Sequence, residues 1–359
     1  MSNIYSALQK RLDMYSLGFP ETESKVEIDL LKNLFSEQEA RLFLELTPAL
    51  ETAEVIAVRI GKDVSETERQ LNSMVKKGLL FKKTKDGIAK YSAIPFMHGL
   101  LEFQINRMDK NLALLFQQYY DEALNKAVAK SANMFLRPVP VVEQTIIRLD
   151  ATVETKSPVA SFEDAAAIIQ KAPVIAVAHC VCRKEKNIIG KGCGKPIETC
   201  FMFGSMAEYY IENNLGRKLS ADEAVSIVKN AQRQGLVTQP GTAQNPAGMC
   251  SCCGDCCGVL LSIKKFPKPA EMVFSNYYAE TTDNCSACGL CTDMCQMEAI
   301  EIKDKAHVNK DRCIGCGLCV LSCPNEGIQL IQKEQAKKIP PTTSGEQMME
   351  MAKQRGLIK

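Results

Sequence analysis

The chain has 359 residues, of which 46% are apolar, and its formal net charge is +2. Because domains usually contain about 100 to 200 residues, this length predicts two to four of them. The near-neutral charge excludes a global electrostatic attraction to nucleic acid or to a membrane surface.

All 17 cysteines lie between Cys180 and Cys323, so the first 179 residues contain none. This asymmetry predicts an N-terminal half without metal and a metal-rich C-terminal half. In an oxidising compartment such density would indicate disulfides, but the spacings described below require reduced thiols. The first residues contain no apolar h-region, and no run reaches the roughly 18 apolar residues of a membrane span. We therefore expect a soluble cytoplasmic protein from an anaerobic setting.

The N-terminal region begins with residues 1–33, which we expect to form a polar lead-in with one short helix. Ser36 with Glu39 then forms a capping box in front of apolar residues at helical spacing. A second helix is predicted over residues 52–60, before Gly61.

A third helix is predicted to open at the capping box Ser65 and Glu68, and a hairpin follows with its turn at Asp86-Gly87. Three short helices followed by a two-stranded hairpin resemble a winged helix-turn-helix domain, here over residues 34–97. In DNA-binding members the third helix enters the major groove and the wing contacts phosphates.

The charges of this region do not favour DNA binding. Glu66 and Glu68 begin the third helix, where a phosphate backbone would repel them, and residues 1–100 hold 14 Lys and Arg against 14 Asp and Glu. The hairpin itself is basic. DNA binding is therefore a possibility that we do not favour, and a docking or dimerisation module is the preferred interpretation.

Residues 98–150 are predicted to form a long helix, from His98 to about Lys130, and an extended connector ending in a strand over residues 144–150. The apolar positions of the helix fit either packing within the chain or a homodimer. We expect His98 to be a helix-start residue without a ligand role.

The central region, residues 151–270, carries nine cysteines. A buried strand over residues 174–178 leads to four in the spacing C-x-C-x10-C-x6-C, and a dense run of five follows. The nine candidate metal ligands are Cys180, Cys182, Cys193, Cys200, Cys250, Cys252, Cys253, Cys256 and Cys257. Such a density is atypical of free structural thiols and indicates a metal site.

Spacing alone leaves open three ways to divide these nine cysteines. The first four could bind a cube-shaped [4Fe-4S] cluster with a second site in the dense run, one unusual cluster could take ligands from both groups, or a zinc site could lie beside a [4Fe-4S] cluster. The arrangement HCVCR, GCGKPIETC, CSCCGDCC is similar to an uncharacterised class of multi-cluster ferredoxin-type proteins of anaerobes. His179 is a candidate ligand, although a structural role is the preferred interpretation. The basic residues from Arg183 to Lys195 are expected to form a solvated loop.

The third region, residues 271–333, contains C-x2-C-x2-C-x3-C twice. The eight cysteines are Cys285, Cys288, Cys291, Cys295, Cys313, Cys316, Cys319 and Cys323. This spacing resembles the two-cluster bacterial ferredoxin motif, in which the fourth cysteine of each run ligates the other cluster. The resemblance implies one [4Fe-4S] cluster bound by Cys285, Cys288, Cys291 and Cys323. It implies a second cluster bound by Cys313, Cys316, Cys319 and Cys295. Gln296 stands where the family usually has proline. Paired zinc sites are the alternative.

These observations predict a multidomain α+β protein: a winged-helix-like domain, an α/β cysteine-rich domain, a ferredoxin-like dicluster domain and a tail over residues 334–359. The predicted function is iron–sulfur electron transfer, as a carrier or subunit that serves redox partner proteins through two [4Fe-4S] clusters and a further central iron–sulfur cluster or zinc site. The alternative is a redox-responsive winged-helix transcription regulator. If the protein is an enzyme, an iron–sulfur oxidoreductase is expected.

Overall fold

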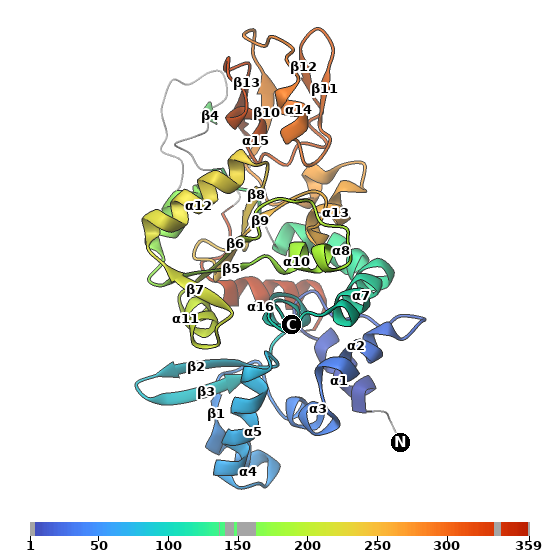
Figure 1. Ribbon diagram of the computed structural model, residues 1–359, viewed down its shortest axis with the longest axis vertical. Coiled ribbons are helices and arrows are strands. Elements are labelled where there is room, and N and C mark those ends of the chain that lie inside the picture. The colour runs from blue at the N-terminus through green and yellow to red at the C-terminus, as the bar shows by residue number, and fades with distance from the viewer. Residues whose placement is uncertain (1–3, 136, 141–146, 149–162, 334–338, 358–359) are drawn as a thin grey trace.

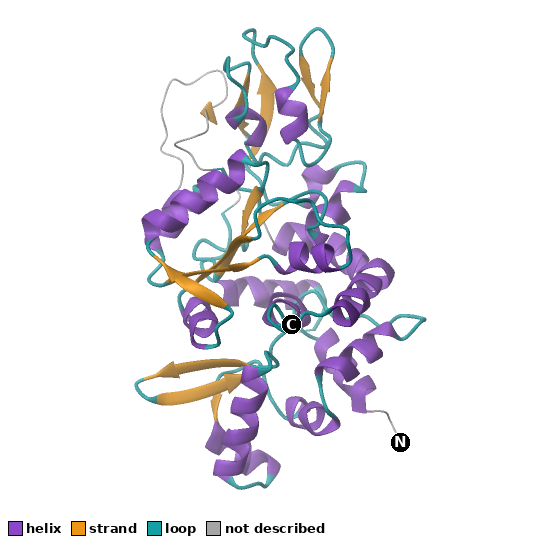
Figure 2. Ribbon diagram, in the orientation of Figure 1, coloured by secondary structure: helices purple, strands orange, loops and turns teal. Residues whose placement is uncertain are grey.

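The computed structural model describes residues 4–135, 137–140, 147–148, 163–333 and 339–357. Figure 1 shows an elongated molecule with strands β10 (Tyr277–Thr281) to β13 (Ile328–Gln332) at one end of its long axis and helix α4 (Ala53–Ile60) at the other. The hairpin of β2 (Phe81–Lys85) and β3 (Ile88–Ser92) lies between α4 and a five-stranded sheet in the middle of the molecule. The chain contains both helices and strands (Figure 2), in agreement with the predicted α+β class, while the predicted domain architecture stays a prediction. Within the described residues, no helix has the length and apolar character that a membrane span requires.

The first part of the chain folds into helices and one small sheet. Its elements are α1 (Ile4–Asp13), α2 (Val26–Leu34), α3 (Glu37–Leu44), β1 (Glu51–Thr52), α4 (Ala53–Ile60), α5 (Val64–Lys76), β2 (Phe81–Lys85) and β3 (Ile88–Ser92). The capping box of Ser36 and Glu39 is confirmed. The predicted cap at Ser65 is wrong, because the carboxylate of Asp63 accepts the hydrogen bond from the backbone N–H of Glu66 and begins α5 there.

The lead-in prediction was wrong for residues 1–33, which hold two helices instead of one. Leu8 and Leu12 of α1, and Leu30 and Leu31 of α2, are fully buried. Helix α2 packs on α7, which is described below, so this segment belongs to the core.

The hairpin prediction is confirmed. Strands β2 and β3 pair in antiparallel register, and Asp86 and Gly87 both adopt the left-handed conformation that a tight hairpin turn requires. Strand β1 joins the other side of β3, which gives the order β1-β3-β2. The winged-helix assignment itself stays a prediction.

The predicted long helix is divided. Its segments are η1 (Phe96–Leu100), α6 (Leu101–Phe103), α7 (Lys110–Tyr119), η2 (Tyr120–Leu124) and α8 (Asn125–Phe135). The break precedes α7, where the Asp109 side chain accepts from the N–H of Leu112 and caps a new helix. Helices α7 and α8 pack on α2 and on two central helices, and a homodimer through this segment stays a prediction.

The central region is an antiparallel sheet with helices around it. Its elements are α9 (Ala165–Lys171), β5 (Ile175–His179), α10 (Val181–Ile188), β6 (Glu198–Phe203), α11 (Ser205–Glu212), β7 (Gly216–Leu219), α12 (Ala221–Arg233), β8 (Val237–Pro240), β9 (Gly248–Cys252) and α13 (Gly258–Lys264). The strand order is β7-β5-β6-β9-β8. The predicted buried strand is β5, which lies inside the sheet between β7 and β6.

Tyr209 of α11 joins the hairpin to the central region. Its ring stacks on Phe103 with ring centroids 4.5 Å apart, and the ring of Phe81 in β2 lies 5.1 Å away. Its buried hydroxyl donates to the carbonyl oxygen of Leu80 over 2.9 Å. The base of the hairpin is therefore packed against the sheet domain.

The C-terminal part contains η5 (Pro269–Met272), β10 (Tyr277–Thr281), α14 (Leu290–Met294), β11 (Ile300–Ile302), β12 (Ala306–Val308), α15 (Leu318–Leu321), β13 (Ile328–Gln332) and α16 (Ser344–Gln354). Strand β13 pairs with β10 and, in parallel, with β4 (Ile147–Arg148). Strand β4 belongs to the predicted strand over residues 144–150, whose other residues lie outside the described part of the chain. Helix α16 has its own capping box.

Candidate metal centres

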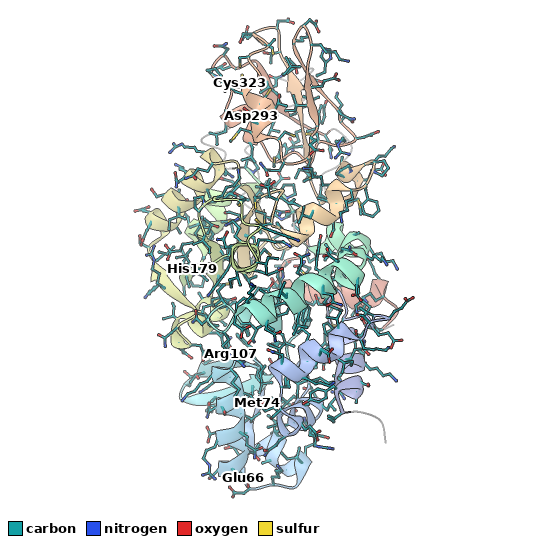
Figure 3. All side chains as sticks on the ribbon, turned by 45° about the vertical axis from the view of Figure 1, so that its right-hand side comes forward. Glu66, Met74, Arg107, His179, Asp293 and Cys323 are labelled. Atoms are coloured by element: carbon teal, nitrogen blue, oxygen red, sulfur yellow. The ribbon has the colours of Figure 1, made fainter. Side chains whose placement is uncertain are left out.

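The eight cysteines of the C-terminal module surround two small cavities of about 20 Å³ each. The first cavity is lined by Cys285, Cys288, Cys291 and Cys323, and the second by Cys295, Cys313, Cys316 and Cys319. The fourth cysteine of each run thus lies with the other run, which is the grouping that the crossed ferredoxin pattern implies. Figure 3 shows Cys323 at the end of the molecule opposite Glu66.

Two glycines allow the loops to close around these cavities. Gly315 has φ +69°, and a Cβ there would lie 2.3 Å from the carbonyl oxygen of Tyr277. A Cβ on Gly327 would lie 2.7 Å from the Cα of Cys285. Neither position has room for a side chain, so the two chain segments can approach each other this closely only because both residues are glycine.

Backbone N–H groups point at the sulfurs of both groups. Ala306 and Gly327 donate to Cys285 and Cys323 over 3.4 and 3.1 Å in the first group. In the second, Ala279 and Ala299 donate to Cys313 and Cys295 over 3.3 and 3.2 Å. Such hydrogen bonds stabilise negative charge on sulfur and raise the reduction potential of an iron–sulfur cluster.

Burial by itself disfavours free thiolates here. It raises the pKa of the Cys316 thiol to about 12 and raises that of Cys319 as well. Because a metal ligand must be deprotonated, bound metal would supply the positive charge that these buried sulfurs lack. The donor set and its burial therefore fit metal clusters.

The central sheet brings six further cysteines together. Cys200 of β6 lies directly across from Cys250 of β9, and Cys252 is two residues further along the same face of β9. Cys180 and Cys182 come from the start of α10. Cys257 precedes α13, and all six line one cavity of about 70 Å³, which we call the six-thiol cavity. Cys256 also borders it.

The other wall of the six-thiol cavity comes from η1 and α6, about 80 residues earlier in the chain. His98 lies there in the left-handed conformation, with φ 59° and ψ 44°, and burial lowers its pKa to about 4, which leaves the ring neutral at pH 7. Glu102 also lines the cavity, and burial raises its pKa to about 7. His98 is therefore part of a cavity wall, and no spacing in the sequence indicated this position.

Arg183 of α10 is 1% exposed and lies beside these cysteines. Its guanidinium donates to the carbonyl oxygen of Ser251 over 2.8 Å and to the hydroxyl of Thr199. Among the described residues no carboxylate pairs with it, and its Nε has no hydrogen-bond partner.

The charge of Arg183 is balanced by sulfur. Burial lowers its pKa, but the negative charges of Cys180, Cys252 and Cys253 outweigh that effect and raise it. A buried cation of this kind requires anionic partners, so the neighbouring cysteines fit a thiolate–metal centre. The prediction of a solvated basic loop was wrong for Arg183 and also for Lys186, whose ammonium reaches the side chain of Gln117.

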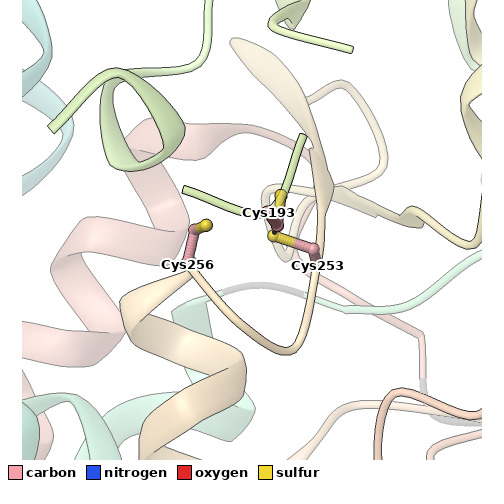
Figure 4. Close-up of side chains that lie close together, drawn as sticks. All are labelled: Cys193, Cys253 and Cys256. Carbon is pink, nitrogen blue, oxygen red and sulfur yellow. Dashed lines mark hydrogen bonds between the residues drawn. The ribbon is translucent and has the colours of Figure 1, made fainter. Parts of the chain in front are cut away.

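The remaining three central cysteines form a second group beside the six-thiol cavity, which we call the three-thiol site (Figure 4). Cys193 lies in the loop after α10, and Cys253 and Cys256 lie in the turn between β9 and α13. The sulfurs are all within 4.8 Å of one another. A hydrogen bond from the thiol of Cys256 lowers the pKa of Cys253 to about 5.

His179 stands apart from both groups of central cysteines. It is exposed at the end of β5, and the residues that line the six-thiol cavity do not include it. This exposed position outside the cavity gives no support to a ligand role for His179, and its structural role stays a prediction.

Gln296, the residue found where the ferredoxin pattern has proline, joins the dicluster module to the central region. Its side-chain oxygen accepts a 2.6 Å hydrogen bond from the N–H of Gly254. Gly254 follows Cys253, and Gln296 follows Cys295 of the second dicluster group. Proline has no side-chain amide for this contact, so the departure from the pattern connects the two cysteine-rich regions.

These features define the C-terminal module as a two-cluster iron–sulfur module of ferredoxin type. The model of the 4Fe-4S dicluster domain family matches residues 284–327, which contain all eight of its cysteines. No curated protein and no solved structure matches the chain. The family match therefore covers the module alone, and the nine central cysteines are an additional group that could bind a further metal centre.

Proposed function

We propose that the protein is an iron–sulfur electron-transfer protein, a carrier or a subunit of a larger redox system, in which the dicluster module exchanges electrons with a third cluster in the six-thiol cavity. The observation that carries this proposal is the direct contact between Gln296 and Gly254. It joins the loop of the second dicluster group to the cysteine turn of the central region. Partners of this function would be redox proteins.

The residues proposed to hold the clusters follow from the three cavities. The first [4Fe-4S] cluster would be held by Cys285, Cys288, Cys291 and Cys323, the second by Cys295, Cys313, Cys316 and Cys319, and the third by cysteines from the set Cys180, Cys182, Cys200, Cys250, Cys252 and Cys257. When bound, each cluster accepts and returns one electron at a time. The backbone N–H groups and Arg183 stabilise the negative charge that an added electron brings.

The exposure of the two dicluster groups suggests a direction of electron transfer through the protein. Cys288 of the first group is exposed, whereas Cys313 and Cys319 of the second are buried and that group lies next to the central turn. A redox partner would therefore dock at the first group, and electrons would pass through the second group toward the six-thiol cavity.

The packing of the hairpin supports a docking role for the N-terminal region rather than the regulator alternative. Tyr209 holds the base of the hairpin against the central region through Phe81 and Leu80. The first turn of α5 carries Glu66, which would face the phosphates of bound DNA. We therefore keep electron transfer as the proposed function.

A reductive titration tests this proposal. The anaerobically purified chain should take up about three electrons reversibly, one for each cluster, with a distinct paramagnetic signal for each reduced centre. The titration should be followed by absorbance and electron paramagnetic resonance together. A chain that holds its iron but takes up no electrons reversibly would contradict electron transfer.

A further inference from the structure

The sulfurs of the three-thiol site are spaced for one metal ion. When metal–sulfur bonds are about 2.3 Å long, two thiolates on a tetrahedral ion lie about 3.8 Å apart. The sulfurs of Cys193 and Cys253 are 3.6 Å apart, and Cys256 completes a triangle with no side longer than 4.8 Å. Figure 4 shows the three side chains converging from two separate segments.

The dicluster cysteines have a different spacing. A [4Fe-4S] cluster keeps its thiolates apart, because each of them binds a different iron at a corner of the cube. In keeping with this, no three of the eight dicluster cysteines, all of them described, come within 4.8 Å of one another. The same holds for the six cysteines proposed for the third cluster. Neighbouring pairs among the six do touch, as Cys250 does with Cys200 and Cys252, but among the described residues only the three-thiol site brings three sulfurs within 4.8 Å of one another.

The three-thiol site also has its own surroundings. Cys253 and Cys256 are almost completely buried and pack with Ala231 and Leu236 in a small apolar cluster, separate from the main core that contains Cys200, Cys252 and Cys257. Cys193 is only half-buried and closes one side of the group. The site is therefore enclosed on its protein side and accessible at one edge.

We propose that Cys193, Cys253 and Cys256 bind a single tetrahedral zinc ion, separate from the iron–sulfur clusters, with a solvent or other exogenous ligand in the fourth position. Zn²⁺ prefers thiolate ligands and tetrahedral geometry, and three protein ligands leave one position open. Three thiolates and one Zn²⁺ carry one negative charge, and the buried guanidinium of Arg183 interacts favourably with one of these thiolates, that of Cys253. The proposal does not depend on the electron-transfer function.

The local sequence allows Cys193 to reach this position. A Cβ on Gly192 would overlap the side-chain oxygen of Asn187, and Gly194 has φ +71°, so the backbone on both sides of the cysteine favours glycine. An ion at this site would tie the loop after α10 to the turn that carries Gly254. It would thereby fix the turn that Gln296 contacts, and its own charge would not change during electron transfer because zinc is redox-inert.

Metal analysis of two single variants of the full-length chain tests the proposal. Wild-type protein purified anaerobically should contain about one zinc per chain. Cys193→Ser should lose that zinc and keep its iron, whereas the matched variant Cys257→Ser, at the neighbouring cavity, should lose about four iron and keep its zinc. X-ray absorption at the zinc edge of the wild-type protein should show three sulfur ligands at about 2.3 Å and one lighter ligand, and it does not depend on how a variant folds.

Three results would overturn the zinc assignment. The first is wild-type protein that contains no zinc when its iron is complete. The second is a Cys193→Ser protein that keeps its zinc, and the third is one that loses about four iron, which would make Cys193 a cluster ligand. None of these results would bear on reversible reduction of the dicluster module, so failure of this proposal is distinguishable from failure of the proposed function.

Discussion

Replacing Cys323 with alanine is expected to destroy the cluster of Cys285, Cys288 and Cys291, although Cys323 belongs to the other cysteine run. Its sulfur lines the cavity of that first group and accepts the N–H of Gly327. An iron without its fourth protein thiolate is exposed to exchange, so about four iron per chain should be lost. Iron analysis and the spectra of the reduced clusters would measure the effect.

Cys295→Ala is the matched control for this prediction. Because Cys295 lines the second cavity, its removal should damage the cluster of Cys313, Cys316 and Cys319 and leave the first intact. If each variant instead damages only the cluster of its own run, the crossed arrangement is wrong.

Cys252→Ala is expected to remove the third cluster. Cys252 lies between Cys250 and Cys257 in the wall of the six-thiol cavity, and its loss would leave the charge of Arg183 with one fewer anionic partner. We expect about four iron per chain to be lost. Truncation next to a buried cation also destabilises the fold, by roughly 3 to 5 kcal/mol if the charge becomes uncompensated.

The control is Met249→Leu, a buried substitution of similar volume three residues away that packs in the core formed by the other face of the sheet. It should cost less than about 1.5 kcal/mol and leave the iron content unchanged. Spectra of the two dicluster centres should be the same in both variants. Loss of a dicluster signal in Cys252→Ala, with the central signal retained, would contradict the assignment.

The dicluster module could be predicted from the sequence because its ligands are close together in the chain. Four cysteines within eleven residues leave few ways to bind metal, and the turn at Asp86-Gly87 and the capping box at Ser36 are equally local signals. The start of α5 shows the limit of such local signals, since Asp63 caps this helix and Ser65, the predicted cap, does not. Both residues are good caps, and the sequence does not rank them.

The central site could not be partitioned from the sequence because its members meet only in the folded sheet. Cys200 reaches Cys250 through strand pairing over 50 residues, and Cys193 reaches Cys253 across 60. Arg183 looked like part of a charged surface loop, and only packing shows it buried among sulfurs. His98 enters the cavity from a segment whose pattern indicated a simple helix start. Long-range contacts of this kind produce no recognisable pattern of residue spacing in the sequence.

The most direct test of this account is to count iron and acid-labile sulfide in the full-length chain purified without oxygen. Two clusters in the dicluster module and one in the six-thiol cavity predict about twelve iron and about twelve sulfide per chain, since each [4Fe-4S] cluster holds four of each. About eight iron per chain would show that the six-thiol cavity holds no [4Fe-4S] cluster. About four iron in intact protein would contradict its central claim, because the two crossed groups of cysteines would then not hold two clusters.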